Sequence, residues 1–135
     1  MTGLFLAPDI EQMVSSFLRD QPEATDILGD RIYTEIPQSP TWPLARITLI
    51  DGAPTDRIGW LNSPLLQIEV WGGPKATAYT ACATLTALMR RMRGTHDLGV
   101  VTETEVVSSP TWRPDDTFKP AKPRYIAQVR LWVHP

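Results

Sequence analysis

The residues of this chain that could do chemistry are few and widely spaced. Glu103 and Glu105 share one face of an expected strand, and paired carboxylates can act as general acid and base. His96 follows a predicted helix end in RGTHD, and Cys82 would be a nucleophile only if its thiol were accessible. Each also has a structural interpretation: a solvated strand face for the glutamates, a surface turn for His96, and the apolar stripe of a helix for Cys82. We therefore expect no enzyme activity, and a small hydrolase using Glu103, Glu105 or His96 stays an alternative.

Cofactor-binding patterns are missing from the sequence as well. The two histidines and the single cysteine form no HxxxH, CxxC or HExxH spacing, so no metal site is expected. The GGPK stretch at residues 72–75 lacks the GxxxxGK[ST] spacing of a phosphate-binding loop. It is better interpreted as the exit of a strand, with Pro74 starting a helix. Asp115 and Asp116 fall in a predicted loop and are expected to be solvated. The sequence thus predicts no cofactor.

Length and charge limit the remaining classes of protein. The 135 residues predict a single domain, residues 1–135, with an ordinary 42% of hydrophobic residues. The net charge of −2 argues against a protein whose main task is to grip nucleic acid. A single cysteine excludes an internal disulfide framework and favours a reducing compartment. No apolar run is long enough for a membrane helix, and the N-terminus lacks the basic region of a secretory signal.

Hydrophobic periodicity predicts two amphipathic helices. The first follows Pro8 and carries apolar residues at helical spacing from Ile10 to Leu18. The second covers residues 74–93, with Cys82 inside its apolar stripe and Gly94 placed to cap it. A short helical turn is expected around residues 24–28, before Gly29.

Alternating apolar residues predict strands between and after these helices. A short strand is expected at residues 31–36, and longer ones at residues 44–51, 65–71, 100–107 and 124–133. Residues 52–64 and 108–123 are interpreted as two long proline-rich hairpin loops. The order favours an α+β fold, a mostly antiparallel four-stranded sheet with the two amphipathic helices packed on one face. The loops are predicted to project as arms that reach neighbouring subunits.

The tryptophans have unusual positions. Trp71 and Trp132 fall on the strand faces opposite the apolar ones, beside Glu69 and Arg130. Because exposed aromatic and arginine residues concentrate at interfaces, we predict a subunit or partner interface there, and Trp71→Ala is expected to weaken assembly more than folding. Burial of Trp71 under a folded-back loop such as residues 52–64 is the alternative. Side chains of the two hairpin loops complete the predicted interface: Arg57, Trp60, Trp112 and Arg113.

The order of several motifs resembles a known protein family. LGDRIY at residues 28–33, WPLARITLID at residues 42–51, and SPLLQIEVWGGPKATAYTACATL at residues 63–85 follow one another, and an antiparallel pair ends the chain. Nearly the whole chain is similar in length and element order to the tail terminator, or tail completion, proteins of long-tailed bacteriophages and to related minor tail and neck proteins.

This resemblance implies a structural virion protein, assembled in the host cytoplasm, that caps the tail tube as a hexameric ring and joins it to the head-side connector. It implies self-association, binding to the tail tube protein and the connector protein, and only transient, non-specific passage of DNA through the lumen. It implies no enzyme activity, cofactor, metal or membrane. Two alternatives stay open beside the hydrolase: a head-side connector or adaptor protein of the neck, and a binding module for a small ligand, which would need an apolar pocket with converging polar groups.

Overall fold

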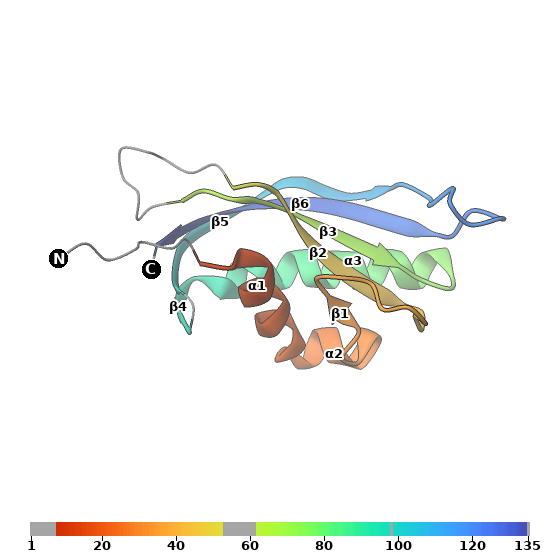
Figure 1. Ribbon diagram of the computed structural model, residues 1–135, viewed down its shortest axis with the longest axis horizontal. Coiled ribbons are helices and arrows are strands. Elements are labelled where there is room, and N and C mark those ends of the chain that lie inside the picture. Colours follow the sequence, from red (N-terminus) through yellow and green to blue (C-terminus); the bar gives the residue numbers. More distant parts are fainter. Residues whose placement is uncertain (1–7, 53–61, 98, 135) are drawn as a thin grey trace.

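A computed structural model describes residues 8–52, 62–97 and 99–134 of the chain (Figure 1). In these residues there are three α-helices: α1 (Ile10–Arg19), α2 (Pro22–Leu28) and α3 (Lys75–Leu88), which continues into the 3-10 helix η1 (Met89–Met92). Asp9 caps α1, because its side chain accepts a hydrogen bond from the backbone N–H of Gln12 at 3.1 Å. The two amphipathic helices predicted from periodicity are therefore present, and α2 lies where a short helical turn was expected around residues 24–28.

The strands form one six-stranded sheet in the order β1-β2-β3-β6-β5-β4. They are β1 (Ile32–Tyr33), β2 (Leu44–Asp51), β3 (Leu65–Trp71), β4 (Gly94–His96), β5 (Gly99–Trp112) and β6 (Arg124–His134). β1 pairs with β2 in parallel, and the other neighbouring strands are antiparallel. Figure 1 shows the sheet curving over α3, with α1 and α2 on the same side of it. We call this side the helix side and the opposite surface of the sheet the outer face.

The prediction of a four-stranded antiparallel sheet with two helices is wrong. The sheet has six strands and is mixed, and three helices accompany it. Of the two strands outside the predicted sheet, β1 lies within the short strand expected at residues 31–36, and β4, with three residues, is too short to show a period of two in the sequence. The segment around β1 was readable as extended, but its parallel pairing with β2 is set by tertiary structure. Gly94, expected to cap the preceding helix, instead begins β4 with a φ of 130°.

The strand predicted at residues 100–107 is longer than expected. β5 reaches Trp112, so the first part of the loop predicted at residues 108–123 is strand, and β5 and β6 form a long hairpin that extends past the end of α3 in Figure 1. This strand is not evident from the sequence, because its serines and Pro110 have low strand propensity. Register shifts interrupt the ladder between Val106 and Thr111, and such irregular edge positions tolerate a proline. The loop predicted at residues 52–64 falls largely outside the described residues.

The hydrophobic core lies between the helices and the helix side of the sheet. Ile47, Ile68 and Val129 come from neighbouring strands, and Val14 and Leu85 from the helices, all fully buried. Gly72 permits the chain to pass directly from β3 into the connection to α3. A Cβ atom at Gly72 would lie 2.9 Å from the Cβ and the backbone nitrogen of Ala78, which is closer than real atoms approach. The double glycine after Trp71 thus includes one position required by packing.

Candidate assembly surface

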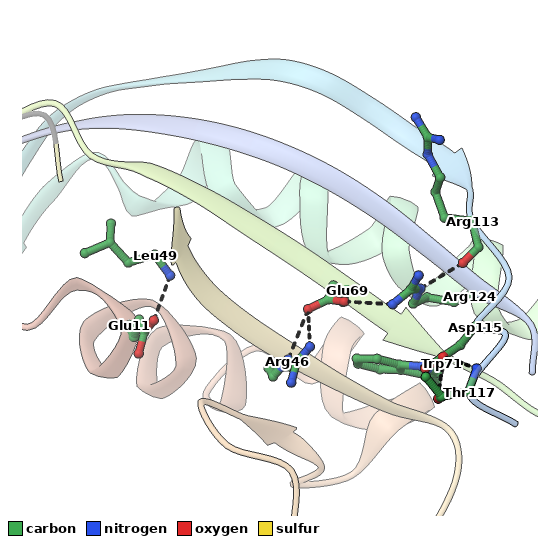
Figure 2. Close-up of polar contacts among 9 residues, drawn as sticks. All are labelled: Glu11, Arg46, Leu49, Glu69, Trp71, Arg113, Asp115, Thr117 and Arg124. Carbon is green, nitrogen blue, oxygen red and sulfur yellow. Dashed lines mark hydrogen bonds and ion pairs between the residues drawn. The ribbon is translucent and has the colours of Figure 1, made fainter. Parts of the chain in front are cut away.

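Trp71 lies on the outer face but is buried by the chain itself. Its side chain is 2% exposed, and its indole N–H donates a hydrogen bond to Asp115 Oδ2 at 2.8 Å (Figure 2). Asp115 belongs to the connection between β5 and β6, and its other carboxylate oxygen accepts hydrogen bonds from the backbone N–H and the hydroxyl of Thr117 at 3.1 and 2.6 Å. The ring of Trp42 packs beside Trp71, with 6.4 Å between the ring centroids. The end of the hairpin is thereby fastened onto β3.

Glu69 holds two arginines from the neighbouring strands in the same region. Arg46 on β2 donates through Nε and Nη2 to Glu69 Oε1 at 3.0 and 2.8 Å, and Arg124 on β6 donates to Oε2 at 3.2 Å. The Glu69 side chain is 4% exposed, whereas those of Arg46 and Arg124 are 35% and 22% exposed. Both guanidinium groups also lie over the ring of Trp71, at 5.2 and 5.7 Å from its centroid.

These residues join three strands and the hairpin connection, and we call them the Trp71 brace: Trp71, Glu69, Arg46, Arg124, Asp115 and Thr117. Figure 2 shows their side chains converging on the end of β3. Arg124 also donates through Nε to the backbone carbonyl oxygen of Arg113 at 2.8 Å, which ties β6 to the start of the connection. Two carboxylates balance two guanidinium groups, as a satisfied structural network requires.

The electrostatics of the brace favour a structural role over acid–base chemistry. Burial acts to raise the pKa of Asp115, but hydrogen bonds from Thr117 and Trp71, with the positive charge of Arg124, outweigh it and lower this pKa below its usual range. Asp115 is therefore an ionised hydrogen-bond acceptor at neutral pH. A general acid needs the opposite shift.

The brace changes the interpretation of Trp71 and Glu69 as interface residues. Both are buried in the single chain, so neither presents its side chain to a partner. The alternative of a folded-back segment describes Trp71 better, and in the described part of the chain the covering residues are Trp42 and the connection after β5. The order of effects expected for Trp71→Ala is accordingly reversed: folding should suffer first.

The other predicted interface residues have mixed surroundings. Trp132 and Arg130 are half-buried on the outer face, where Arg130 donates to the carbonyl oxygen of Ser63 at 2.6 Å. Trp112 and Arg113 are exposed at the far end of β5, and Lys75 lies 4.3 Å over the Trp112 ring. Arg57 and Trp60 lie outside the described residues. For these residues the interface stays a prediction.

Sequence reasoning did not single out Arg46 or Arg124, and its expectation that Asp115 is solvated is wrong, because this carboxylate is 9% exposed and accepts hydrogen bonds from Trp71 and Thr117. A usable signal existed for Arg46, because alternation along β2 and β3 puts it on the same face as Glu69, and the two are direct cross-strand partners. Asp115 could not be found in this way, since its contact with Trp71 joins residues 44 positions apart through a loop.

The residues of the hydrolase alternative do not converge in the described part of the chain. His96 Nε2 donates to the carbonyl oxygen of Met92 at 2.6 Å, and its ring contacts Phe17 edge to face. Glu103 instead accepts from the backbone N–H of Thr104 at 3.0 Å and approaches Arg93 at 4.0 Å. Within the described residues, no hydrogen bond or ion pair joins His96 to either glutamate, and no three or more side chains form a cluster suited to a metal ion.

Two grooves lie beside these residues. One of about 460 Å³ lies between α1 and β4 and is lined by Phe17, Asp20 and His96 among others. The second, of about 480 Å³, lies between η1 and β5.

Burial raises the pKa of the Cys82 thiol to about 12, which makes this cysteine a poor nucleophile and supports its interpretation as a core residue. Among the helices of the described residues, none has the length and apolar character to span a membrane.

Comparison with known proteins shows a solved structure with a similar fold. Neither a protein-family model nor a curated protein matches the sequence. Among solved structures, a chain described as "Virion of native gene transfer agent (GTA) particle" is similar with a TM-score of 0.67 and 16% sequence identity. The match covers 93% of this chain and 95% of that chain. At this identity the likeness is one of fold, and it extends over almost the whole of both chains.

Proposed function

We propose that this chain is a structural protein of a phage-like virion, which forms a ring at the head-side end of the tail tube and joins the tube to the connector. The observation that carries the proposal is the fold shared with a chain of a gene transfer agent virion over nearly the full length of both chains. The resemblance of LGDRIY and of the strand-to-helix step at residues 63–85 to tail terminators supports the proposed position at the end of the tail tube.

The described surface supports a role in assembly. Large apolar side chains are exposed at several places: Leu49, Ile50, Tyr79, Val107, Trp112 and Phe118. Three of them belong to β5 and the connection that follows it. Apolar groups along a projecting hairpin favour contact with another protein. The Trp71 brace fastens the end of this hairpin onto β3, so the exposed side chains near that end are held in a defined position.

The proposal excludes turnover as the function of the chain. The ionised Asp115 and the separate surroundings of His96 and Glu103 support this part of it. None of Glu103→Gln, Glu105→Gln and His96→Ala should therefore abolish a turnover, and His96→Ala should leave assembly intact. A turnover that one of these substitutions abolishes would overturn the non-enzymatic part.

Electron microscopy of the purified chain, alone and with tail tubes built from the cognate tube protein, tests the ring. We expect rings with a central hole, bound at one end of each tube, and a mass in solution that rises with protein concentration. A chain that stays a monomer at every concentration, with and without tubes, would refute the proposal. Trp112→Ala should reduce tube binding, and Ser39→Ala, at an exposed position on the connection between β1 and β2, is the control.

The same experiment separates the head-side connector alternative. A tail terminator should bind tube ends in the absence of connector protein. Binding to isolated connectors but never to tube ends would favour the adaptor, which shares the virion location but not the partner.

A further inference from the structure

The two edges of the sheet differ in how they are closed. At the β2 edge, β1 pairs with Ala45 and Arg46, and farther along Glu11 of α1 accepts a hydrogen bond from the backbone N–H of Leu49 at 2.7 Å (Figure 2). A helix side chain thus occupies a donor that another strand would need. At the β5 edge, β4 pairs only with residues 99–101. Within the described chain, residues 102–112 of β5 have no strand beside them on this side.

In the single chain, a neighbouring side chain satisfies one backbone N–H group of this open edge. The backbone N–H of Thr104 donates to the carboxylate of Glu103, its own neighbour, at 3.0 Å, so this N–H points away from β6. Backbone groups that point out of a sheet edge can accept an added strand. The Glu103 carboxylate is 56% exposed and can move aside when a carbonyl oxygen of another strand takes its place.

A groove runs beside this edge where an added strand would place its side chains. Arg90 of η1 and Arg93, which follows this helix, form one wall and Thr104 and Val106 of β5 the other, over the buried Val129. Thr104 and Val106 are cross-strand partners of Leu131 and Val129, which places this lining on the helix side. The groove volume of about 480 Å³ suits a few apolar side chains.

The charges at the groove select the kind of segment that fits. Two arginines, Arg90 and Arg93, face two glutamates, Glu103 and Glu105, around the opening. Because the positive and negative groups balance, a strongly charged segment gains nothing from the site, whereas an uncharged apolar one avoids burying an unpaired charge. Residues 1–7 of this chain, MTGLFLA, contain no charged side chain, and Leu4 and Leu6 would share one face of an extended segment.

We propose that residues 1–7 of one copy dock along the open β5 edge of a neighbouring copy, with Leu4 and Leu6 in the groove between η1 and β5. Fully extended, seven residues span about 23 Å, which the stretch at residues 102–112 can accommodate. The described chain starts at Pro8, whose ring lies 3.2 Å from where a Cβ of Gly99 would be, at the beginning of β5. There β4 already occupies the edge of the same copy, so the open stretch beyond it is offered to a neighbour.

This inference rests on the proposed assembly of several copies, and it deepens that proposal by assigning one intersubunit contact. Each copy then both donates one segment and accepts one. The contact is heterologous, as a closed ring requires.

Disulfide trapping between two single-cysteine variants of the full chain tests the contact. Leu4→Cys and Thr104→Cys are purified separately, mixed, assembled and oxidised. We expect a crosslinked heterodimer, because the two cysteines can meet only between copies. Leu4→Cys mixed with Ser39→Cys is the matched control, since Ser39 is exposed on the connection between β1 and β2 and should give no crosslink. The native Cys82 is fully buried and does not compete.

Removal of residues 1–7 is the second measurement. The truncated chain should keep the far-UV circular dichroism of the full chain and lose rings at concentrations where the full chain forms them. Rings that persist after truncation, or rings without the crosslink, would overturn this inference and leave the proposed function standing. A Leu4→Cys/Thr104→Cys chain that crosslinks only within itself would also overturn it. Absence of rings from the full chain, with and without tubes, counts instead against the proposed function.

Discussion

Replacing Trp71 by alanine should unfold the single chain more readily than it weakens any contact between copies. The side chain is 2% exposed and lies among Trp42, Asp115 and two guanidinium groups. Truncation of a buried aromatic residue typically costs about 3–5 kcal/mol, from lost transfer energy and the cavity left behind. Loss of the indole N–H also removes one of three hydrogen bonds to Asp115, worth about 1 kcal/mol. We expect a total loss of about 4–6 kcal/mol in the free energy of unfolding.

Urea denaturation followed by far-UV circular dichroism, at a concentration where the chain is a single protomer, measures this loss. Trp71→Phe separates its two parts, because it keeps most of the ring and removes the N–H donor; it should cost about 1–2 kcal/mol. Trp112→Ala is the matched control. This tryptophan is 38% exposed, so its truncation should cost under about 2 kcal/mol.

The reasoning is refuted if Trp71→Ala changes the free energy of unfolding by less than about 1 kcal/mol while it prevents ring formation. Such a result would mean that the indole is free to leave the brace and bind a partner. Equal losses for Trp71→Ala and Trp112→Ala would likewise contradict the burial argument.

Three further expectations follow from the brace and the core. Glu69→Ala should cost about 2–3 kcal/mol in urea denaturation, since two arginines lose their carboxylate partner; their partial exposure keeps the loss below that of a fully buried pair, and a loss under about 0.5 kcal/mol would contradict the assignment. Because the pKa of Asp115 is lowered in the folded state, its contribution to stability is complete above its unfolded pKa of about 4 and is lost as the pH falls through the lower folded value. Urea midpoints at pH 5 and pH 3 should therefore differ more in the native chain than in Thr117→Ala, and an equal difference would count against the network. The Cys82 thiol, with its pKa raised to about 12, should react with a thiol reagent at pH 8 only after unfolding in urea, and rapid reaction of the folded chain would show that it is accessible.

The long elements of this fold can be predicted from the sequence because their periods are complete. The apolar stripe of α1 and the alternation along β2, β3 and β6 extend over several repeats, so a period of 3.6 or 2 is visible. β1 and β4 have two and three residues, too few for a period to repeat, and the parallel pairing of β1 with β2 depends on tertiary structure. Hydrophobic periodicity therefore could not predict the mixed topology or the number of strands.

The same distinction holds for the candidate site. Position on the polar face of a strand correctly separated Trp71 from the apolar core stripe, but it could not reveal what would cover this residue. That depends on Asp115 and Thr117, which fold back from a connection with no periodic pattern. β5 was predicted too short for a related reason, since an edge strand with Pro110 and two serines carries weak propensity and is stabilised mainly by its pairing with β6.

The unequal closure of the two sheet edges also bears on solubility. Copies cannot join their sheets by apposing a β5 edge to a β2 edge, because Glu11 occupies the N–H of Leu49 and β1 covers the adjacent residues. Endless lateral stacking of sheets, the usual route from an exposed edge to fibrous aggregates, is thus blocked at one of its two ends. The chain can then reach a high concentration without polymerising through its sheet edges.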